Sequence, residues 1–166
     1  MTIQDRTILA LQYLYLNSKE TQDMEYVKSF RCQDPLAHAK EFATIKMQTS
    51  RRAGHTQAIA ELFNHLSDQW IVLSPNLKMS KLINNRCKKC IKPTTKKATI
   101  LELTYPNLHI FFKSIQQLKN GGLRGYEING VIIDGTFGLK NKDIKMIYRE
   151  LLPSMIFETK YFIFVQ

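Results

Sequence analysis

Short apolar runs alternate with amphipathic segments along most of the chain, and this pattern predicts strands separated by helices. Six apolar runs have the length of strands: residues 44–49, 70–74, 99–104, 108–112, 130–134 and 160–165. Between them, apolar residues recur at helical spacing in four segments: residues 56–66, 76–87, 115–119 and 141–151. Alternating strands and helices predict a mostly parallel sheet with helices on both faces, because each crossover helix must cover one face. We therefore expect a three-layer α/β fold.

The beginning of the chain predicts helices without strands. Helical patterns cover three segments, at residues 5–16, 23–30 and 35–40. A chain of 166 residues, 44% of them hydrophobic, has the size and composition of one globular domain. We expect one domain, with a helical lead-in over residues 1–41 and an α/β core over residues 42–166.

A polar turn between the first predicted strand and the next helix has the layout of a phosphate-binding loop. Its candidate nucleotide-binding residues are Ser50, Arg51, Arg52, Ala53, Gly54, His55 and Thr56. In such a loop, backbone N–H groups and a helix N-terminus face the anion. The usual pattern is G-x-x-x-x-G-K-[ST]; here Thr49 replaces the first Gly and His55 replaces the Lys. Only two of the four fixed positions match, so an ordinary turn with Thr56 as a helix N-cap is an open alternative.

An acidic residue ends the apolar run Gly130-Val131-Ile132-Ile133-Asp134. In phosphate-binding-loop enzymes an Asp at the end of a buried strand binds Mg²⁺ together with the Ser or Thr of the loop. Asp134 and Thr56 are therefore candidate metal ligands, and Asp134 is also a candidate catalytic residue. The alternative is a buried strand followed by an Asp-Gly turn.

The combination of Leu123-Arg124-Gly125, a short spacer and the strand that ends in Asp134 resembles the ATPase domain of the large terminase subunits of tailed bacteriophages. Those proteins are helicase-like DNA-packaging motors. The segment from Ser50 to Thr56 resembles their loop, and the resemblance covers roughly residues 36–166. It implies a P-loop NTPase-like fold, ATP and Mg²⁺ as cofactors, and a role in DNA metabolism or packaging. Arg124 becomes a catalytic candidate by its place in the motif.

Two departures from that family predict weak or partner-dependent hydrolysis. His55 is shorter than Lys and mostly neutral at pH 7, so Arg51 or Arg52 is the candidate source of positive charge. Gly135 stands where the resembled motors carry the Glu that activates water. The sequence also stops after residues 160–165, before the coupling motif and nuclease domain of a complete packaging motor. The alternative to an ATP-binding protein is a non-enzymatic nucleic-acid-binding or regulatory module on the same fold.

The chain is strongly basic, which favours a polyanionic partner. Lys and Arg number 24 against 14 acidic residues, a formal net charge of +10. One segment without an acid gathers six candidate nucleic-acid-binding cations: Arg86, Lys88, Lys89, Lys92, Lys96 and Lys97. We expect nucleic acid as a partner, DNA rather than RNA, alongside a phage or host protein. The alternative is a solvated basic loop.

Neither a membrane partner nor secretion is expected. The sequence has no apolar run of 18 residues and does not begin like a signal peptide. Its three Cys residues are typical of a reducing compartment, so we expect the cytoplasm, or the host cytoplasm for a viral protein. Cys87 and Cys90 have the spacing of half a zinc site, although two ordinary thiols are the simpler interpretation.

Overall fold

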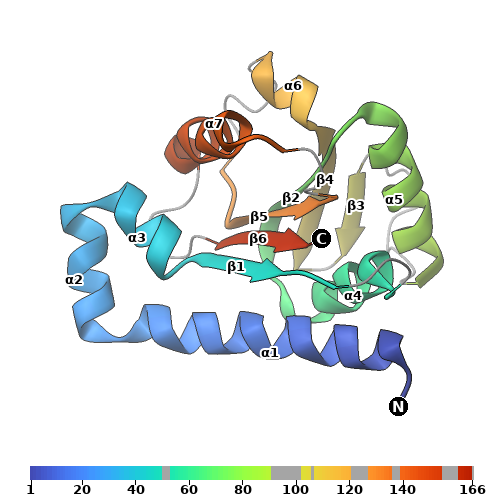
Figure 1. Ribbon diagram of the computed structural model, residues 1–166, viewed down its shortest axis with the longest axis horizontal. Helices are drawn as coiled ribbons and strands as arrows, with labels where there is room; N and C mark the ends of the chain where they lie inside the picture. The colour runs from blue at the N-terminus through green and yellow to red at the C-terminus, as the bar shows by residue number, and fades with distance from the viewer. Residues whose placement is uncertain are drawn as a thin grey trace.

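The computed structural model describes residues 1–49, 53–90, 102–105, 107–120, 127–135, 139–154 and 161–165. The strands form one sheet: β1 (Thr44–Met47), β2 (Asp68–Ser74), β3 (Glu102–Tyr105), β4 (Leu108–Ser114), β5 (Gly130–Asp134) and β6 (Tyr161–Val165). Their order is β1-β6-β5-β2-β4-β3 (Figure 1). The first five are parallel, and β3 pairs antiparallel with β4 at one edge. The mostly parallel sheet is confirmed.

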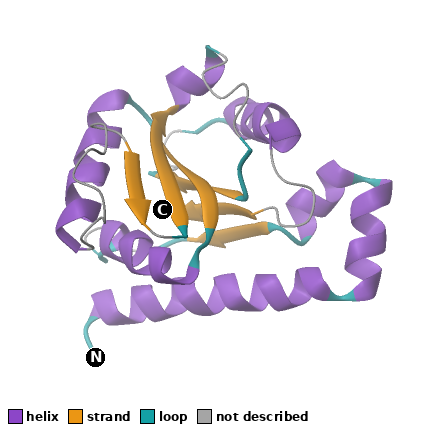
Figure 2. Ribbon diagram, turned by 180° about the vertical axis from the view of Figure 1, so that it is seen from behind, coloured by secondary structure: helices purple, strands orange, loops and turns teal. Residues whose placement is uncertain are grey.

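Helices cover both faces of this sheet, which confirms the three-layer prediction (Figures 1 and 2). The hydrophobic core on one face includes side chains of α1 (Ile3–Asp23), α4 (His55–Leu62) and α5 (Leu77–Cys90). The core on the other face includes side chains of α3 (Pro35–Glu41), α6 (Ile115–Lys119) and α7 (Asn141–Leu151). The remaining helices are α2 (Glu25–Gln33) and the short 3₁₀ turns η1 (Phe63–His65) and η2 (Leu152–Ser154). No helix in the described ranges is long and apolar enough to cross a membrane.

The helical lead-in exists, but its first helix is longer than the pattern predicted. The capping residue is Thr2, because its hydroxyl accepts from the Asp5 N–H while the Asp5 carboxylate accepts from the Thr2 N–H. The helix also continues through Ser18, where an end was expected. The Ser18 hydroxyl donates to the carbonyl of Phe42 (3.1 Å), so the side chain satisfies its hydroxyl without interrupting the helix.

The central strands carry large apolar side chains on both faces, as a sheet between two helical layers requires. Along β2, Trp70 and Val72 join the core under α1, α4 and α5, whereas Ile71 and Leu73 join the core under α7. Trp70 is 1% exposed and lies opposite Gly130 of β5 in the strand register. Its ring occupies the space beside Gly130, so the absence of a side chain on β5 makes room for the largest side chain on β2.

We predict that Gly130→Ala destabilises the protein by about 1–3 kcal/mol, the usual cost of overpacking a core. A Cβ at residue 130 would lie 2.3 Å from Cζ3 of Trp70, which is buried and has no space to retreat into. Urea denaturation measures the free energy of unfolding. Replacing Trp70 with Phe removes part of the indole, so Gly130→Ala should cost less in that background. An equal cost in both backgrounds would show that the contact with Trp70 is not the cause.

Candidate functional site

The register of the parallel strands brings the polar turn and Asp134 to the same end of the sheet. Met47, the last residue of β1, pairs with Val165 of β6, and Val165 pairs with Asp134, the last residue of β5. Because the three strands are parallel, the chain leaves β1 toward the turn at the edge where β5 ends. The turn and Asp134 therefore lie at the same end of the sheet. Open α/β sheets bind ligands outside the carboxyl ends of their strands, which is this edge.

Gly54 is the N-cap of α4, and its conformation requires glycine. It has φ +85° and ψ 30°, in the left-handed region that side chains rarely adopt. The first helical hydrogen bond runs from the N–H of Ala58 to the carbonyl of Gly54 (2.9 Å). The alternative that Thr56 is the N-cap is wrong, because the helix begins one residue earlier and Thr56 lies in its first turn.

A glycine N-cap leaves the first turn of α4 without a side chain that accepts from its N–H groups. No side-chain capping bond is present at this helix end among the described residues. The first N–H groups of a helix need an acceptor, and together with the positive end of the helix dipole they favour an anion. The start of α4 therefore has the electrostatics of a phosphate site.

Asp134 is a buried carboxyl in a positive environment. Its residue is 8% exposed, and burial raises its pKa above the ordinary value of 3.8 because the charged form loses its hydration. His55, the N–H of Gly135 and the guanidinium of Arg86 act in the opposite direction, in that order of size. These groups come from the helices α4 and α5 and from the end of β5, so three elements direct positive charge toward this carboxyl.

His55 connects the two ends of the turn. Its ring Nε2 is hydrogen-bonded to the hydroxyl of Thr49. These are the two residues that replace the first Gly and the Lys of the usual motif. The usual motif has a flexible glycine and a long, charged lysine at these two positions. Here the two side chains are hydrogen-bonded to each other, which links the two ends of the turn.

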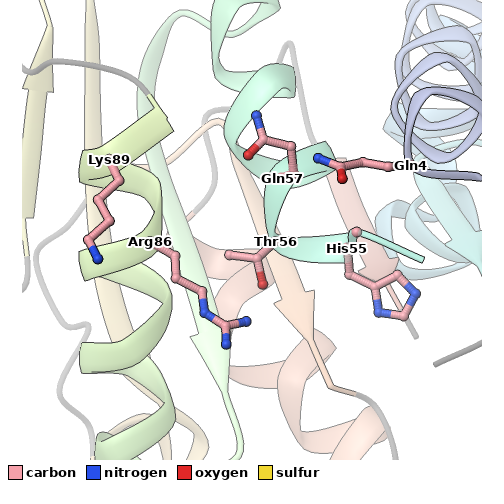
Figure 3. A pocket seen from close by; sticks show the side chains of 7 residues that line it. Gln4, His55, Thr56, Gln57, Arg86 and Lys89 are labelled. Atoms are coloured by element: carbon pink, nitrogen blue, oxygen red, sulfur yellow. The ribbon is translucent and has the colours of Figure 1, made fainter. Parts of the chain in front are cut away.

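A cavity of about 520 Å³ lies beside the start of α4 (Figure 3). Its described lining comes from three helices and consists of Gln4, Gly54, His55, Thr56, Gln57, Arg86 and Lys89. Its volume falls within the range of small-molecule sites. Gln4 shows how closely α1 covers the turn, because a Cβ on Gly54 would lie 2.7 Å from its Cγ.

The structure divides the basic segment that the sequence presented as one candidate surface. Arg86 and Lys89 are one turn apart on α5 and both line the cavity, as Figure 3 shows. Lys88, between them, is half-buried and does not belong to the cavity lining. Sequence reasoning missed the place of Arg86 and Lys89 in the cavity. The signal was available in the helical pattern at residues 76–87, which continues to Cys90.

The other predicted site residues are not part of the described cavity lining. Seven lie outside the described residues: Ser50, Arg51, Arg52, Lys92, Lys96, Lys97 and Arg124. Ala53 directly precedes the N-cap Gly54 and is buried, with 1% of its surface exposed. Cys87 is buried in the hydrophobic core, and among the described residues no group of three His, Cys, Asp or Glu side chains could hold a metal ion.

We predict that Asp134→Asn raises stability at pH 7. The folded state holds the Asp134 proton more tightly than the unfolded state does, so the contribution of Asp134 to stability is greatest at low pH and falls as pH rises from 3.8 through the folded pKa. Asn cannot ionise, so thermal unfolding should show a higher melting temperature for the variant at pH 7 and a smaller difference near pH 4.

Asp143→Asn is the matched control, and we expect it to change stability at pH 7 in the opposite direction. The N–H of Lys140 and the ammonium of Lys119 bind the Asp143 carboxylate and lower its pKa. Its charged form therefore adds stability above the ordinary pKa and loses it as pH falls. That variant should be less stable at pH 7. A destabilised Asp134→Asn would show that the surrounding positive charge outweighs the cost of burial.

Two solved structures share the fold. An arginine-to-alanine mutant of the large terminase ATPase domain of Thermus phage P74-26 has a TM-score of 0.53 and 16% identity, with 79% of this chain and 62% of that chain covered. Another structure of that domain has a TM-score of 0.51 and 18% identity, with 77% and 62% covered. This chain thus spans about 62% of the length of the structures it matches. No protein-family model and no curated protein matches the sequence. The fold is similar to that of a large terminase ATPase domain, as the resemblance implied.

Proposed function

We propose that the protein binds ATP in the cavity at the start of α4, with Mg²⁺ between the cavity and Asp134, which ends β5 at the same edge of the sheet and is not among the described residues that line the cavity. The observation that carries this proposal is the shared end of the sheet, where a left-handed Gly54 opens an uncapped helix and a buried Asp134 ends β5, which β6 separates from β1. The helix N-terminus would face the phosphates, as in other phosphate-binding loops. Only glycine fits at residue 54, since a Cβ there would lie 2.7 Å from Cγ of Gln4.

The oxygen atoms near the turn suit Mg²⁺. This hard cation prefers carboxylate and hydroxyl oxygens, and usually takes only one or two from the protein, with phosphates and water completing the shell. Thr56 and Asp134 would hold it, with Thr56 in the first turn of α4 and Asp134 at the end of β5. When bound, the ion would offset the charge of the triphosphate. Binding would also favour the ionised form of Asp134, whose pKa burial raises.

Hydrolysis by the isolated protein should be slow. A water molecule needs an acceptor for its proton, and the described lining of the cavity contains no carboxylate. Gly135 has φ +75°, so this position favours glycine and does not suit the Glu of the resembled motors. An acidic or basic group from a partner could complete the site, as activating proteins do for other P-loop enzymes. The proposal is therefore nucleotide binding, with weak or partner-dependent turnover.

We predict that Thr56→Ala and Asp134→Ala each weaken Mg·ATP binding by about tenfold or more, because each removes a charge-assisted contact through the metal. Isothermal titration calorimetry measures the affinity with Mg²⁺ and with EDTA. The variants should differ from the wild type with Mg²⁺ and approach it in EDTA. Thr21→Ala and Asp23→Ala, at the end of α1 remote from α4, are the matched controls (Figure 1).

Three results would count against the proposal or a part of it. A wild-type protein that binds no nucleotide in Mg²⁺ would exclude the function. Unchanged affinity in both variants would place any nucleotide site elsewhere in the chain. Brisk ATP hydrolysis by the wild type alone would contradict the part of the proposal that concerns Gly135.

The net charge of +10 favours a second function, sequence-independent binding of nucleic acid. Two basic regions compete for this role. One is the segment of residues 86–97. The other surrounds α7 on the opposite face of the sheet, where one surface hollow is lined by Lys119, Lys142, Lys145 and Arg149 together with Asp143. Asp143 forms a salt bridge with Lys119 (3.1 Å), which reduces the field of the second region. We propose the first region as the main DNA-binding surface.

We predict that replacing Lys88, Lys92, Lys96 and Lys97 with Gln weakens DNA binding and flattens its dependence on salt, because fewer counterions are released. Replacing Lys119, Lys142, Lys145 and Arg149 with Gln removes the same number of charges and is the matched control. Fluorescence anisotropy with a duplex of mixed sequence, at several salt concentrations, measures both. A larger loss in the control would assign DNA binding to α7. Equal small losses of DNA affinity in the two variants would mean that neither basic region is the main DNA-binding surface.

A further inference from the structure

The turn before α4 lacks the Lys that usually contacts the phosphates, and His55 does not replace it. A Lys side chain would extend into the ligand site, whereas the His55 ring is hydrogen-bonded to Thr49 at the other end of the turn. The outer phosphates of a triphosphate need a cationic partner, and the candidates within the turn, Arg51 and Arg52, lie outside the described residues. The described lining of the cavity offers two other cations, Arg86 and Lys89, both from α5.

We propose that Arg86 binds the outer phosphates of the nucleotide and takes the part that the loop Lys has in other P-loop proteins. This inference rests on the proposed function. Arg86 lines the same cavity as Gly54, His55 and Thr56, and its side chain extends from α5 toward the start of α4 (Figure 3). A guanidinium suits this role, because its planar donors match two phosphate oxygens at once.

Arg86 is better placed than Lys89. Figure 3 shows the Arg86 side chain extending toward Thr56, whereas the Lys89 side chain lies along α5. A cation directed toward Thr56, the candidate metal ligand on α4, would be close to where the outer phosphates bridge to Mg²⁺. Lys89 lies one turn further along α5 and would contribute at the rim of the cavity.

Arg86 is available for a ligand. It is an exposed residue, and among the described residues no carboxylate lies within salt-bridge distance of its guanidinium. An anion in the cavity would therefore not have to displace a carboxylate of the described residues from Arg86.

The backbone of α5 holds Arg86 in a fixed position. The helix begins at a side-chain cap, where the N–H of Met79 donates to Oδ1 of Asn76 (3.0 Å). Its inner face is buried at Ile83 and Cys87, and the hydroxyl of Ser80 is hydrogen-bonded to Ser74 at the end of β2. The site would therefore be assembled from two rigid helices, α4 for the backbone N–H groups and α5 for the guanidinium.

The test compares Arg86→Gln, Arg86→Lys and Arg149→Gln with the wild type by NMR titration with Mg²⁺ and ATP, ADP or AMP. Arg149 is exposed on α7 and is the matched arginine control. Arg86→Gln should weaken ATP binding by about tenfold or more, the worth of a charge-assisted contact, and change AMP binding by less than about twofold. Arg86→Lys should recover part of the loss. Arg149→Gln should bind as the wild type does.

Each outcome that would contradict the role of Arg86 has a different meaning. If the wild type binds ATP and Arg86→Gln binds it equally well, the role of Arg86 is wrong while the proposed function stands. If ATP and AMP lose the same factor, Arg86 supports the cavity as a whole and does not recognise the outer phosphates. If Arg86→Gln leaves nucleotide binding unchanged but weakens DNA binding in the anisotropy assay, Arg86 belongs to the basic segment alone. A wild type that binds none of the three nucleotides removes the proposed function, and this inference with it.

Discussion

The buried carboxyl of Asp134 is the constraint around which the end of the sheet is arranged. Placing it at the end of β5 removes most of its hydration, and His55, the N–H of Gly135 and Arg86 compensate in part. Each compensating group comes from a different element, so the carboxyl is tolerated only while α4, α5 and β5 keep their relative positions. Burial still dominates, since the pKa of Asp134 is raised. A cation or a bound metal at this point would relieve the remaining cost, and this is the physical link between the fold and the proposed ligand.

The lead-in helix α1 contributes to the same arrangement. It packs along the face that carries α4, and its Tyr15 contacts both Trp70 and Tyr161, with ring centroids 6.1 and 5.1 Å away. At its other end Gln4 lies against Gly54, so the helix that stabilises the core also forms one wall of the cavity. The left-handed conformation of Gly54 brings the turn close to Gln4, and a side chain at residue 54 would separate the two. The cavity therefore depends on α1 as well as on the turn.

The sequence predicted the fold better than the site, and particular residues show why. Central strands such as β2 and β5 are apolar on both faces and stand out as continuous runs, so the sheet and its alternating helices were predictable. The start of α1 was not, because the cap at Thr2 depends on a reciprocal bond with Asp5. Arg86 was grouped with its neighbours in sequence, although helical geometry turns Arg86 and Lys89 toward the cavity and Lys88 away from its lining. Which cation faces a site depends on how α5 packs against α4, and that packing is not a property of either segment alone.

The position of Arg86 connects the two proposed functions. In a loop with its own Lys, the phosphate-binding charge moves with the turn; here it would be carried by α5, a separate helix that packs against α4 and β2. The basic segment follows directly from the end of α5, since four of its six cations lie at Lys89 or beyond. A polyanion on that segment would therefore act on the helix that also holds the phosphate ligand. If both proposals hold, the binding of nucleotide and the binding of nucleic acid would be coupled through the orientation of α5. A ligand shifts a conformational equilibrium only when its contacts differ between the conformations of the protein, and both ligands would contact α5.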